Sequence, residues 1–204
     1  LRDKGGTIKG VETNRGTVLA NKVAVVVSGH TTTITETASL RLPIKSFNLA
    51  AFVSEPVKPL IDVIVNCPDL GVYLNQSDKG ELVIGGAPDP GQSFRRDVKQ
   101  NVFEEAVVTM LELFPAFRRL KLLRQWGGVL DIAHDATPII SATDIPGLFV
   151  SCGWWGGFKA VPAGGYTLAH LIATGQPHNV AAPFTLDRFH HLDFIVESGT
   201  TTAR

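Results

Sequence analysis

The residues best suited to binding chemistry form a glycine-rich turn that follows a short apolar run. Leu148–Cys152 is the run, and Gly153-Trp-Trp-Gly-Gly-Phe-Lys159 is the turn. Because glycine has no Cβ, such a turn lets a ligand approach the backbone closely. Ala163, Gly164 and Gly165 then leave room for an anionic or electron-rich ligand at the first turn of a helix. The alternative is a tight strand-to-helix connection without a ligand, since glycine mostly marks backbone geometry.

Lys159 is the candidate for polar recognition at the end of this turn. It lies between Phe158 and the apolar residues Ala160-Val161-Pro162. An ammonium group there can bind the carboxylate of a substrate or an oxygen of a bound cofactor through a charge-assisted hydrogen bond. The alternative is a surface lysine whose stem lies along apolar neighbours. The residues alone favour this second interpretation.

Three other kinds of site are not indicated by the sequence. No Gly-x-Gly-x-x-Gly loop follows an N-terminal strand, so the usual pyrophosphate-binding motif is not found. Ser28 lacks a Gly-x-Ser-x-Gly context, which argues against a hydrolase. The histidines, Cys67 and Cys152 lack metal-ligand spacing, and Cys152 is expected to be a buried free thiol. Asp131 and Asp135 do not form a convincing acid–base pair, and solvated or capping roles are expected for both.

The overall composition limits the partners and the compartment. The formal net charge is +0, which gives no electrostatic reason to expect nucleic acid or an acidic membrane surface. Hydrophobic residues make up 44% and charged residues 19%, which is typical of a globular protein with a core. The longest apolar runs, such as Val23–Val27, are too short to span a bilayer. Two unpaired cysteines suit a reducing cytoplasm, which is the predicted location.

Two kinds of strand pattern occur along the chain. Val23–Val27 and Leu148–Cys152 are apolar without alternation, which is typical of strands covered on both faces in a parallel sheet. Between them, short runs separated by turn residues indicate an antiparallel sheet. Its predicted strands are residues 47–54, 62–66, 71–75, 81–84 and 122–131. Amphipathic periodicity predicts a helix over 97–114, and a second helix over 163–174 ends at Gly175.

These patterns predict an α/β protein with an α+β middle. Residues 1–40 and 143–191 are expected to form parts of one domain, and residues 41–142 an inserted antiparallel-sheet domain. Residues 192–204 are expected to form a polar tail. The chain opens at Leu1 on charged residues and soon enters a predicted hairpin over 7–13 and 17–20. We therefore expect a fragment or a processed piece of a longer protein.

Three segments, in this order, resemble the D-amino-acid-oxidase-like group of flavoenzymes. They are the strand that ends at Ser28-Gly29-His30, the segment Trp126–Asp131 with Asp135 and Thr137–Ile140 behind it, and the motif Gly153–Tyr166. Within that group, three further segments look most like the β subunits of heterotetrameric sarcosine oxidases: Arg41–Ile44, Lys79–Gly86 and Ala182–Phe189. The turn Gly153–Lys159 departs from the group's pattern, which carries one more small residue after the first tryptophan.

The resemblance implies a fold, a reaction and roles for residues. The fold would be the C-terminal part of a Rossmann-like FAD-binding domain (1–40 and 143–191) with an inserted substrate domain (41–142). The reaction would be oxidative demethylation of sarcosine to glycine, with hydride transfer to FAD. Lys159 would bind the substrate carboxylate. The cofactor-binding positions implied are Ser28, Gly29, Gly153, Gly156, Gly157, Phe158 and Lys159.

The resemblance also implies partners that this chain does not supply. They are FMN, covalently attached to a histidine outside this sequence, the α, γ and δ subunits of a heterotetramer, and tetrahydrofolate as an acceptor of the one-carbon unit. Because the dinucleotide loop is missing, the chain alone is expected to hold FAD poorly and to be inactive. Two other functions remain open. One is a related dehydrogenase for dimethylglycine, proline or glycine, and the other is a non-catalytic partner subunit.

Overall fold

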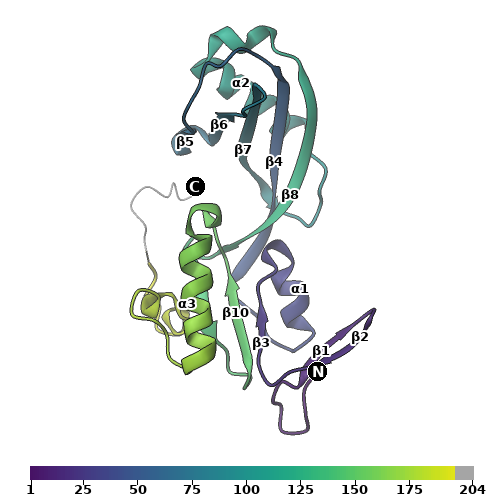
Figure 1. The fold of residues 1–204 in the computed structure, drawn as a ribbon, viewed down its shortest axis with the longest axis vertical. Helices are drawn as coiled ribbons and strands as arrows, with labels where there is room; N and C mark the ends of the chain where they lie inside the picture. Colours follow the sequence, from purple (N-terminus) through teal and green to yellow (C-terminus); the bar gives the residue numbers. More distant parts are fainter. Residues whose placement is uncertain (196–204) are drawn as a thin grey trace. The chain divides into compact units, whose positions relative to one another are not determined.

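The computed structural model describes residues 1–195, and of Ala87 only the backbone. The chain divides into two compact units. The first contains residues 1–45 and the described residues from Leu130 onward, and the second contains residues 46–129. Figure 1 labels helices and strands of both units, among them β3 (Val23–Val25), β10 (Leu148–Cys152) and α3 (Val161–Thr174) of the first and β4 (Ile44–Pro56) and α2 (Gln100–Leu113) of the second. No helix in the described part of the chain combines the length and the apolar character needed to cross a membrane.

A three-stranded sheet lies at the centre of the first unit. Its order is β3 (Val23–Val25), β10 (Leu148–Cys152) and β9 (Ile139–Ala142). β10 is parallel to β3 and antiparallel to β9. The pairing of β3 with β10 joins segments more than a hundred residues apart in one sheet, which is the arrangement that their apolar runs predict.

β10 is buried on both faces, and this explains its run of apolar residues. Leu148, Val150 and Cys152 pack on one side with Ile8, Val25 and Ile139. Phe149 packs on the other side with Leu168 and Leu171 of helix α3 (Val161–Thr174). The same expectation is wrong for most of the run Val23–Val27, in which only Val25 is buried. Val26 and Val27 are 57% and 45% exposed, because β3 ends at Val25 and lies at the edge of the sheet.

Shorter elements complete the first unit. An antiparallel hairpin, β1 (Gly10–Thr13) and β2 (Gly16–Leu19), precedes β3, as the sequence predicts. Two short helices not expected from the sequence follow β3, namely η1 (Ser28–His30) and α1 (Thr31–Glu36). η4 (Gly157–Ala160) precedes α3, while η5 (Ala182–Phe184) and α4 (Asp187–His190) come after it. α3 ends where predicted, with Gly175 in the left-handed conformation at φ 75°.

The second unit is built on a five-stranded sheet. Its order is β5 (Val65–Cys67), β6 (Val72–Gln76), β7 (Glu81–Gln92), β4 (Ile44–Pro56) and β8 (Leu122–Ala133). The pairs β5–β6, β6–β7 and β7–β4 are antiparallel, as the sequence predicts. Helix α2 (Gln100–Leu113) packs against β6 and β7. Short helices η2 (Pro68–Leu70) and η3 (Pro115–Arg119) lie before β6 and after α2.

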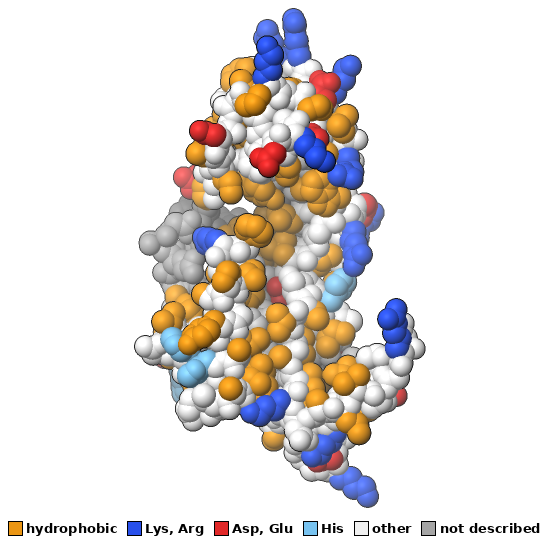
Figure 2. Space-filling view, viewed as in Figure 1, with side chains coloured by type: hydrophobic (Ala, Val, Ile, Leu, Met, Phe, Trp, Pro, Cys, Tyr) orange, Lys and Arg blue, Asp and Glu red, His pale blue; other side chains and the backbone are white. Residues whose placement is uncertain are grey.

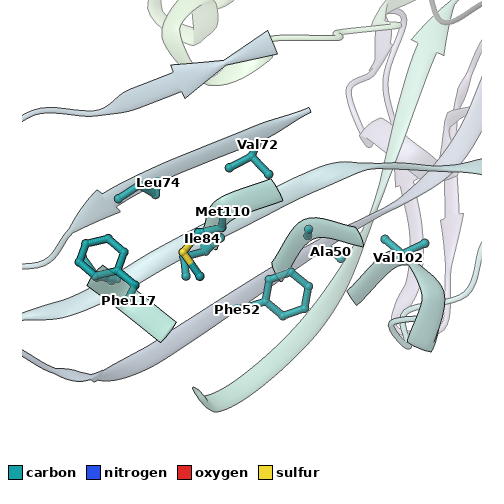
Figure 3. Close-up of a cluster of buried hydrophobic side chains, with 10 residues drawn as sticks. Ala50, Phe52, Val72, Leu74, Ile84, Val102, Met110 and Phe117 are labelled. Carbon is teal, nitrogen blue, oxygen red and sulfur yellow. The ribbon is translucent and has the colours of Figure 1, made fainter. Parts of the chain in front are cut away.

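The core of the second unit fills the space between its sheet and α2 (Figure 3). Phe52 of β4, Leu74 of β6 and Leu82 of β7 are fully buried. From α2, Val102, Ala106 and Met110 recur every four residues and face them, so the apolar stripe read from the sequence is the buried face. The helix starts at Gln100 rather than at residue 97, with Lys99 in extended conformation before it.

The division between the units lies elsewhere than the sequence suggested. It falls after Lys45 and after Val129, within β4 and within β8, rather than after residues 40 and 142. Residues 130–142 belong with the first unit because β9 pairs with β10 along four residues. The predicted tail 192–204 lies outside the described residues from 196 onward, and its first residues belong to the first unit.

Candidate cofactor and substrate site

The carboxyl ends of β3 and β10 define the candidate site in the first unit. Because the two strands are parallel, the segments that follow them leave the sheet at the same edge. Ligands of α/β proteins bind at such an edge. The buried Gly29 lies in the segment that leaves β3, and Gly153 lies directly after β10. Two of the predicted cofactor positions, Gly29 and Gly153, therefore lie at the carboxyl ends of these parallel strands.

Asp131, near the end of β8, joins these segments. Its side chain is fully buried. Thr31 Oγ1 lies 3.0 Å from Asp131 Oδ2 and donates toward it, and Ser28 Oγ lies 3.4 Å from Oδ1. The expectation of a solvated or capping Asp131 is wrong, because the side chain is fully buried and its partners are the hydroxyls of Thr31 and Ser28. These partners lie about a hundred residues earlier in the chain, so no local sequence pattern reveals them.

Cys152 is buried beside this carboxylate. Burial first, and the charge of Asp131 second, raise the pKa of its thiol far above the ordinary value. A thiol that stays protonated is a poor nucleophile and a poor metal ligand. The predicted buried free thiol is confirmed, and Cys152 acts as a small core residue.

Gly153 is required by the backbone at the end of β10. Its φ is +72°, a value that residues with a Cβ rarely adopt. A Cβ there would lie 2.8 Å from Cβ of Ala133, which is too close. The Ala133 N–H also donates to the Gly153 carbonyl at 3.4 Å. This glycine therefore lets the end of β10 pack directly on the end of β8.

Trp154 explains two further glycines of the motif. Its indole N–H donates to Ser151 Oγ at 3.0 Å. A Cβ on Gly164 would lie 2.7 Å from the indole ring, and one on Gly157 would lie 3.0 Å from Cβ of Trp154. The space that the sequence assigned to a ligand at Gly164 is thus filled by Trp154. At Gly165, by contrast, no atom lies within 4 Å of an added Cβ, so a ligand can approach there.

Phe158 and Lys159 are the exposed residues of the turn. Phe158 is 93% exposed, an extreme value for a phenylalanine. Lys159 is also exposed, and within residues 1–195 it makes neither an ion pair nor a hydrogen bond. Its Nζ would be 3.8 Å from a Cβ on Gly156. An unpaired cation and an apolar ring are therefore available to a bound molecule.

A second buried aspartate, Asp135, has a different environment. Arg188 Nε donates to Asp135 Oδ2 at 2.8 Å and Arg188 Nη2 to Oδ1 at 3.0 Å. Arg188 also donates to the carbonyls of Thr137 and Thr185. Burial by itself raises the pKa of Asp135, but the hydrogen bonds and charge of Arg188 and the Ile195 N–H lower it overall. The predicted solvated role is wrong, because the Asp135 side chain is only 3% exposed. A local capping contact is present, since the Thr137 N–H donates to Asp135 Oδ1 at 3.3 Å. The pair with Arg188 also joins the segment after α3 to the segment after β8.

In the second unit, the segment Trp126-Gly127-Gly128 lies on β8. Trp126 is 42% exposed, and the Arg124 guanidinium lies 5.7 Å from its ring centre. A Cβ on Gly127 would lie 2.6 Å from the Arg96 carbonyl oxygen, which explains this glycine by packing. Nothing lies within 4 Å of a Cβ on Gly128. An exposed indole beside an open glycine is compatible with a wall against which a ligand packs.

The histidines give no metal centre in the part of the chain described, where no group of three or more potential ligands occurs. Two of them lie together: His170 and His178 have ring centres 5.1 Å apart, and Tyr166 lies 5.5 Å from His178. Figure 2 shows histidine side chains among hydrophobic ones on the face that carries α3. This cluster consists of ring contacts on and after α3 and includes none of the predicted cofactor positions.

The chain belongs to the FAD-dependent oxidoreductase family, since the family model described as "DAO: FAD dependent oxidoreductase" matches residues 1–171. It is similar to sarcosine oxidase subunit beta of Rhodobacter capsulatus, with 46% identity over 97% of this chain and 48% of that protein. The same subunit of an Arthrobacter species is 44% identical over 98% of this chain and 49% of its own length. The chain thus spans about half the length of these curated relatives.

The solved structures agree with this assignment. The crystal structure of L-proline dehydrogenase from P. horikoshii superposes with a TM-score of 0.85 at 25% identity, over 94% of this chain and 52% of that one. The predicted fold class and the resemblance to sarcosine oxidase β subunits are therefore confirmed. Sequence reasoning missed Asp131 and Arg188, although both lie in segments that carried the resemblance.

Proposed function

We propose that this chain supplies part of the flavin site and the substrate site of an enzyme that oxidises sarcosine to glycine. The observation that carries the proposal is its 42–46% identity, over nearly the whole chain, to proteins named sarcosine oxidase subunit beta. The first unit would belong to the FAD-binding domain. The second unit, with the exposed Trp126, would belong to the domain that covers the substrate.

The residues present at the strand-end edge fit a flavin. Gly153 lets the chain turn sharply at the carboxyl end of β10, and Gly165 leaves open space on the first turns of α3. The positive end of that helix favours negative charge nearby. Residues proposed to hold FAD are Ser28, Gly29, Gly153, Gly156, Gly157, Phe158 and Lys159. When bound, FAD supplies the hydride acceptor for the oxidation of the amine.

Lys159 is proposed to orient the substrate. Its ammonium group is exposed and has no ion-pair partner within residues 1–195, so a substrate carboxylate can become its partner. A charge-assisted hydrogen bond fixes one end of a small amino acid and leaves the N-methyl group to face the flavin. The exposed ring of Phe158 can exclude water beside it.

Further partners are proposed from the same relationship. The relatives are named as subunits, so we propose that this protein works in a complex with α, γ and δ subunits. FMN would pass electrons onward to oxygen, and tetrahydrofolate would accept the one-carbon unit. A cytoplasmic location is proposed because both cysteines are free thiols, which suits a reducing compartment.

The test is made with the full-length protein and its co-expressed subunits. Lys159→Met keeps the length of the side chain and removes the charge, and loss of one charge-assisted hydrogen bond predicts a roughly 10- to 150-fold weaker affinity for sarcosine. FAD content should change little if the lysine faces the substrate, and loss of FAD would assign Lys159 to the cofactor instead. Lys4→Met, at an exposed position, is the matched control and should behave as wild type. Unchanged KM and kcat in Lys159→Met would refute the role of Lys159, and a wild-type protein without flavin would refute the function itself.

A second candidate substrate is supported by one observation. The crystal structure with a TM-score of 0.85 is that of an L-proline dehydrogenase, and proline, like sarcosine, is a secondary amine with a carboxylate. Anaerobic mixing of the flavin-loaded protein with sarcosine, proline, dimethylglycine and glycine separates these candidates. The substrate that bleaches the flavin absorbance fastest at equal concentration identifies the reaction, and no bleaching by any of them would favour a non-catalytic subunit.

A further inference from the structure

Asp131 is a buried carboxylate whose described partners are all uncharged. Its side chain is fully buried, and within residues 1–195 its hydrogen bonds come from the hydroxyls of Thr31 and Ser28, with no ion pair. Asp135, four residues later, has Arg188 as a bidentate partner. A carboxylate taken out of water without a cation is costly for stability. Such a residue needs an explanation other than stabilisation of the fold.

The carboxylate holds a backbone turn of uncommon conformation. Ser28 has a φ of 48°, in the left-handed region that residues other than glycine seldom adopt. Asp131 Oδ1 faces the hydroxyl of Ser28, and Asp131 Oδ2 faces that of Thr31. The Thr31 hydroxyl also lies 2.6 Å from the Ser28 carbonyl oxygen. Asp131 therefore contacts both ends of the turn that contains Gly29.

The same residue is linked to the turn after β10. Two positions further along β8, Ala133 packs on Gly153 and donates to its carbonyl. The charge of Asp131 also acts on Cys152, the residue before Gly153. The end of β8 thus contacts the segment that follows β3 through Asp131 and the segment that follows β10 through Ala133.

We propose that Asp131 is a positioning residue for flavin binding. It holds the Ser28–Thr31 turn and, through β8, the Gly153 turn in the relative arrangement that receives the cofactor. This role rests on the proposed function, in which both turns contact FAD. The strand-end edge would then be preorganised before the cofactor arrives, which reduces the ordering cost of binding.

The experiment measures flavin affinity separately from stability in the full-length protein. Apoprotein is titrated with FAD, the visible circular dichroism of the bound flavin is recorded, and thermal unfolding is followed without FAD. Asp131→Ala and Thr31→Val should each weaken FAD binding about 10- to 100-fold, as expected for a lost hydrogen bond to a charged group, and should change the visible dichroism. Thr31→Ser, which restores the hydroxyl, should return the affinity to near the wild-type value.

Asp135→Asn is the matched control, because it alters a buried aspartate of the same segment that is bound to Arg188 instead. It should lower the unfolding midpoint and leave the FAD affinity and dichroism of the folded protein unchanged. If Asp131→Ala and Thr31→Val lower only the midpoint, Asp131 is structural and the positioning role is overturned. If Asp131→Ala does not fold, the FAD affinities of Thr31→Val and Thr31→Ser decide whether the positioning role holds. If wild-type protein binds no FAD, the proposed function fails first.

Discussion

Asp131 and Asp135 lie in one segment of the first unit and both are buried, yet their surroundings differ. Asp135 has a cation, Arg188, that satisfies both of its oxygens and also binds two carbonyls. Asp131 has two hydroxyls, one of them at the long distance of 3.4 Å. The Arg188 pair joins the Asp135 segment to the segment after α3, whereas Asp131 contacts the segment that leaves β3, where we propose that a ligand binds. On this proposal, one aspartate serves stability and the other serves function.

The largest loss of stability is expected from removing the ion pair between Arg188 and Asp135. Arg188→Met keeps most of the side-chain volume but leaves the Asp135 carboxylate buried without a cation, which costs about 3–5 kcal/mol of unfolding free energy. Urea denaturation of the full-length protein measures it. Arg15→Met, at an exposed position of the hairpin, is the control and should change stability by less than about 0.5 kcal/mol. A change below about 1 kcal/mol in Arg188→Met would show that the pair is not important for stability.

A smaller loss is expected at the strand end, from Gly153→Ala. The added Cβ would lie 2.8 Å from Cβ of Ala133 on a backbone of positive φ, so strain and overpacking together should cost about 2–3 kcal/mol. Gly165→Ala is the matched control, because nothing lies near its Cβ and alanine favours a helix by about 0.5–1 kcal/mol. If Gly165→Ala keeps its stability but loses FAD, the open space at Gly165 belongs to the cofactor. Equal stability of the two variants would contradict the packing argument.

The pH dependence of stability separates the two aspartates further. The net lowering of the Asp135 pKa means that its carboxylate stabilises the fold above the unfolded pKa of about 3.9 and that this stabilisation is lost as the pH falls through the folded value. Unfolding free energy should thus decline below about pH 4, and Arg188→Met should decline less steeply. The pKa values of Asp3, Glu81, Asp89 and Asp97 are also lowered. Only the difference between wild type and variant at each pH reports on Asp135, and parallel curves would refute its contribution.

The sequence predicted the elements better than the contacts between them. The uninterrupted apolar run of β10 and the stop at Gly175 are local signals, and the structure follows both. The buried carboxylate of Asp131 accepts a hydrogen bond from Thr31, which lies a hundred residues earlier. The carboxylate of Asp135 accepts one from Arg188, which lies fifty-three residues later. No local pattern records such pairs. The pairing of β9 with β10 is likewise not visible in a local pattern, and it is why residues 130–142 belong to the first unit and the predicted boundary after residue 142 differed.

The smallest stability effect is expected at Asp131 itself, and it is the sharpest test of the comparison. Asp131→Asn keeps the shape of the side chain and one acceptor oxygen for the Thr31 hydroxyl, and it removes a buried charge that has no cation partner within residues 1–195. The energy recovered by burying an amide in place of a carboxylate offsets the weaker hydrogen bond, so unfolding free energy should change by no more than about 1 kcal/mol. Asp135→Asn, the same chemical change four residues away, leaves Arg188 without its counter-charge and should cost at least about 3 kcal/mol. Parallel urea denaturation of the two variants gives both values directly. If they lose equal stability, the two aspartates play the same structural part, and the proposed division between stability and function is wrong.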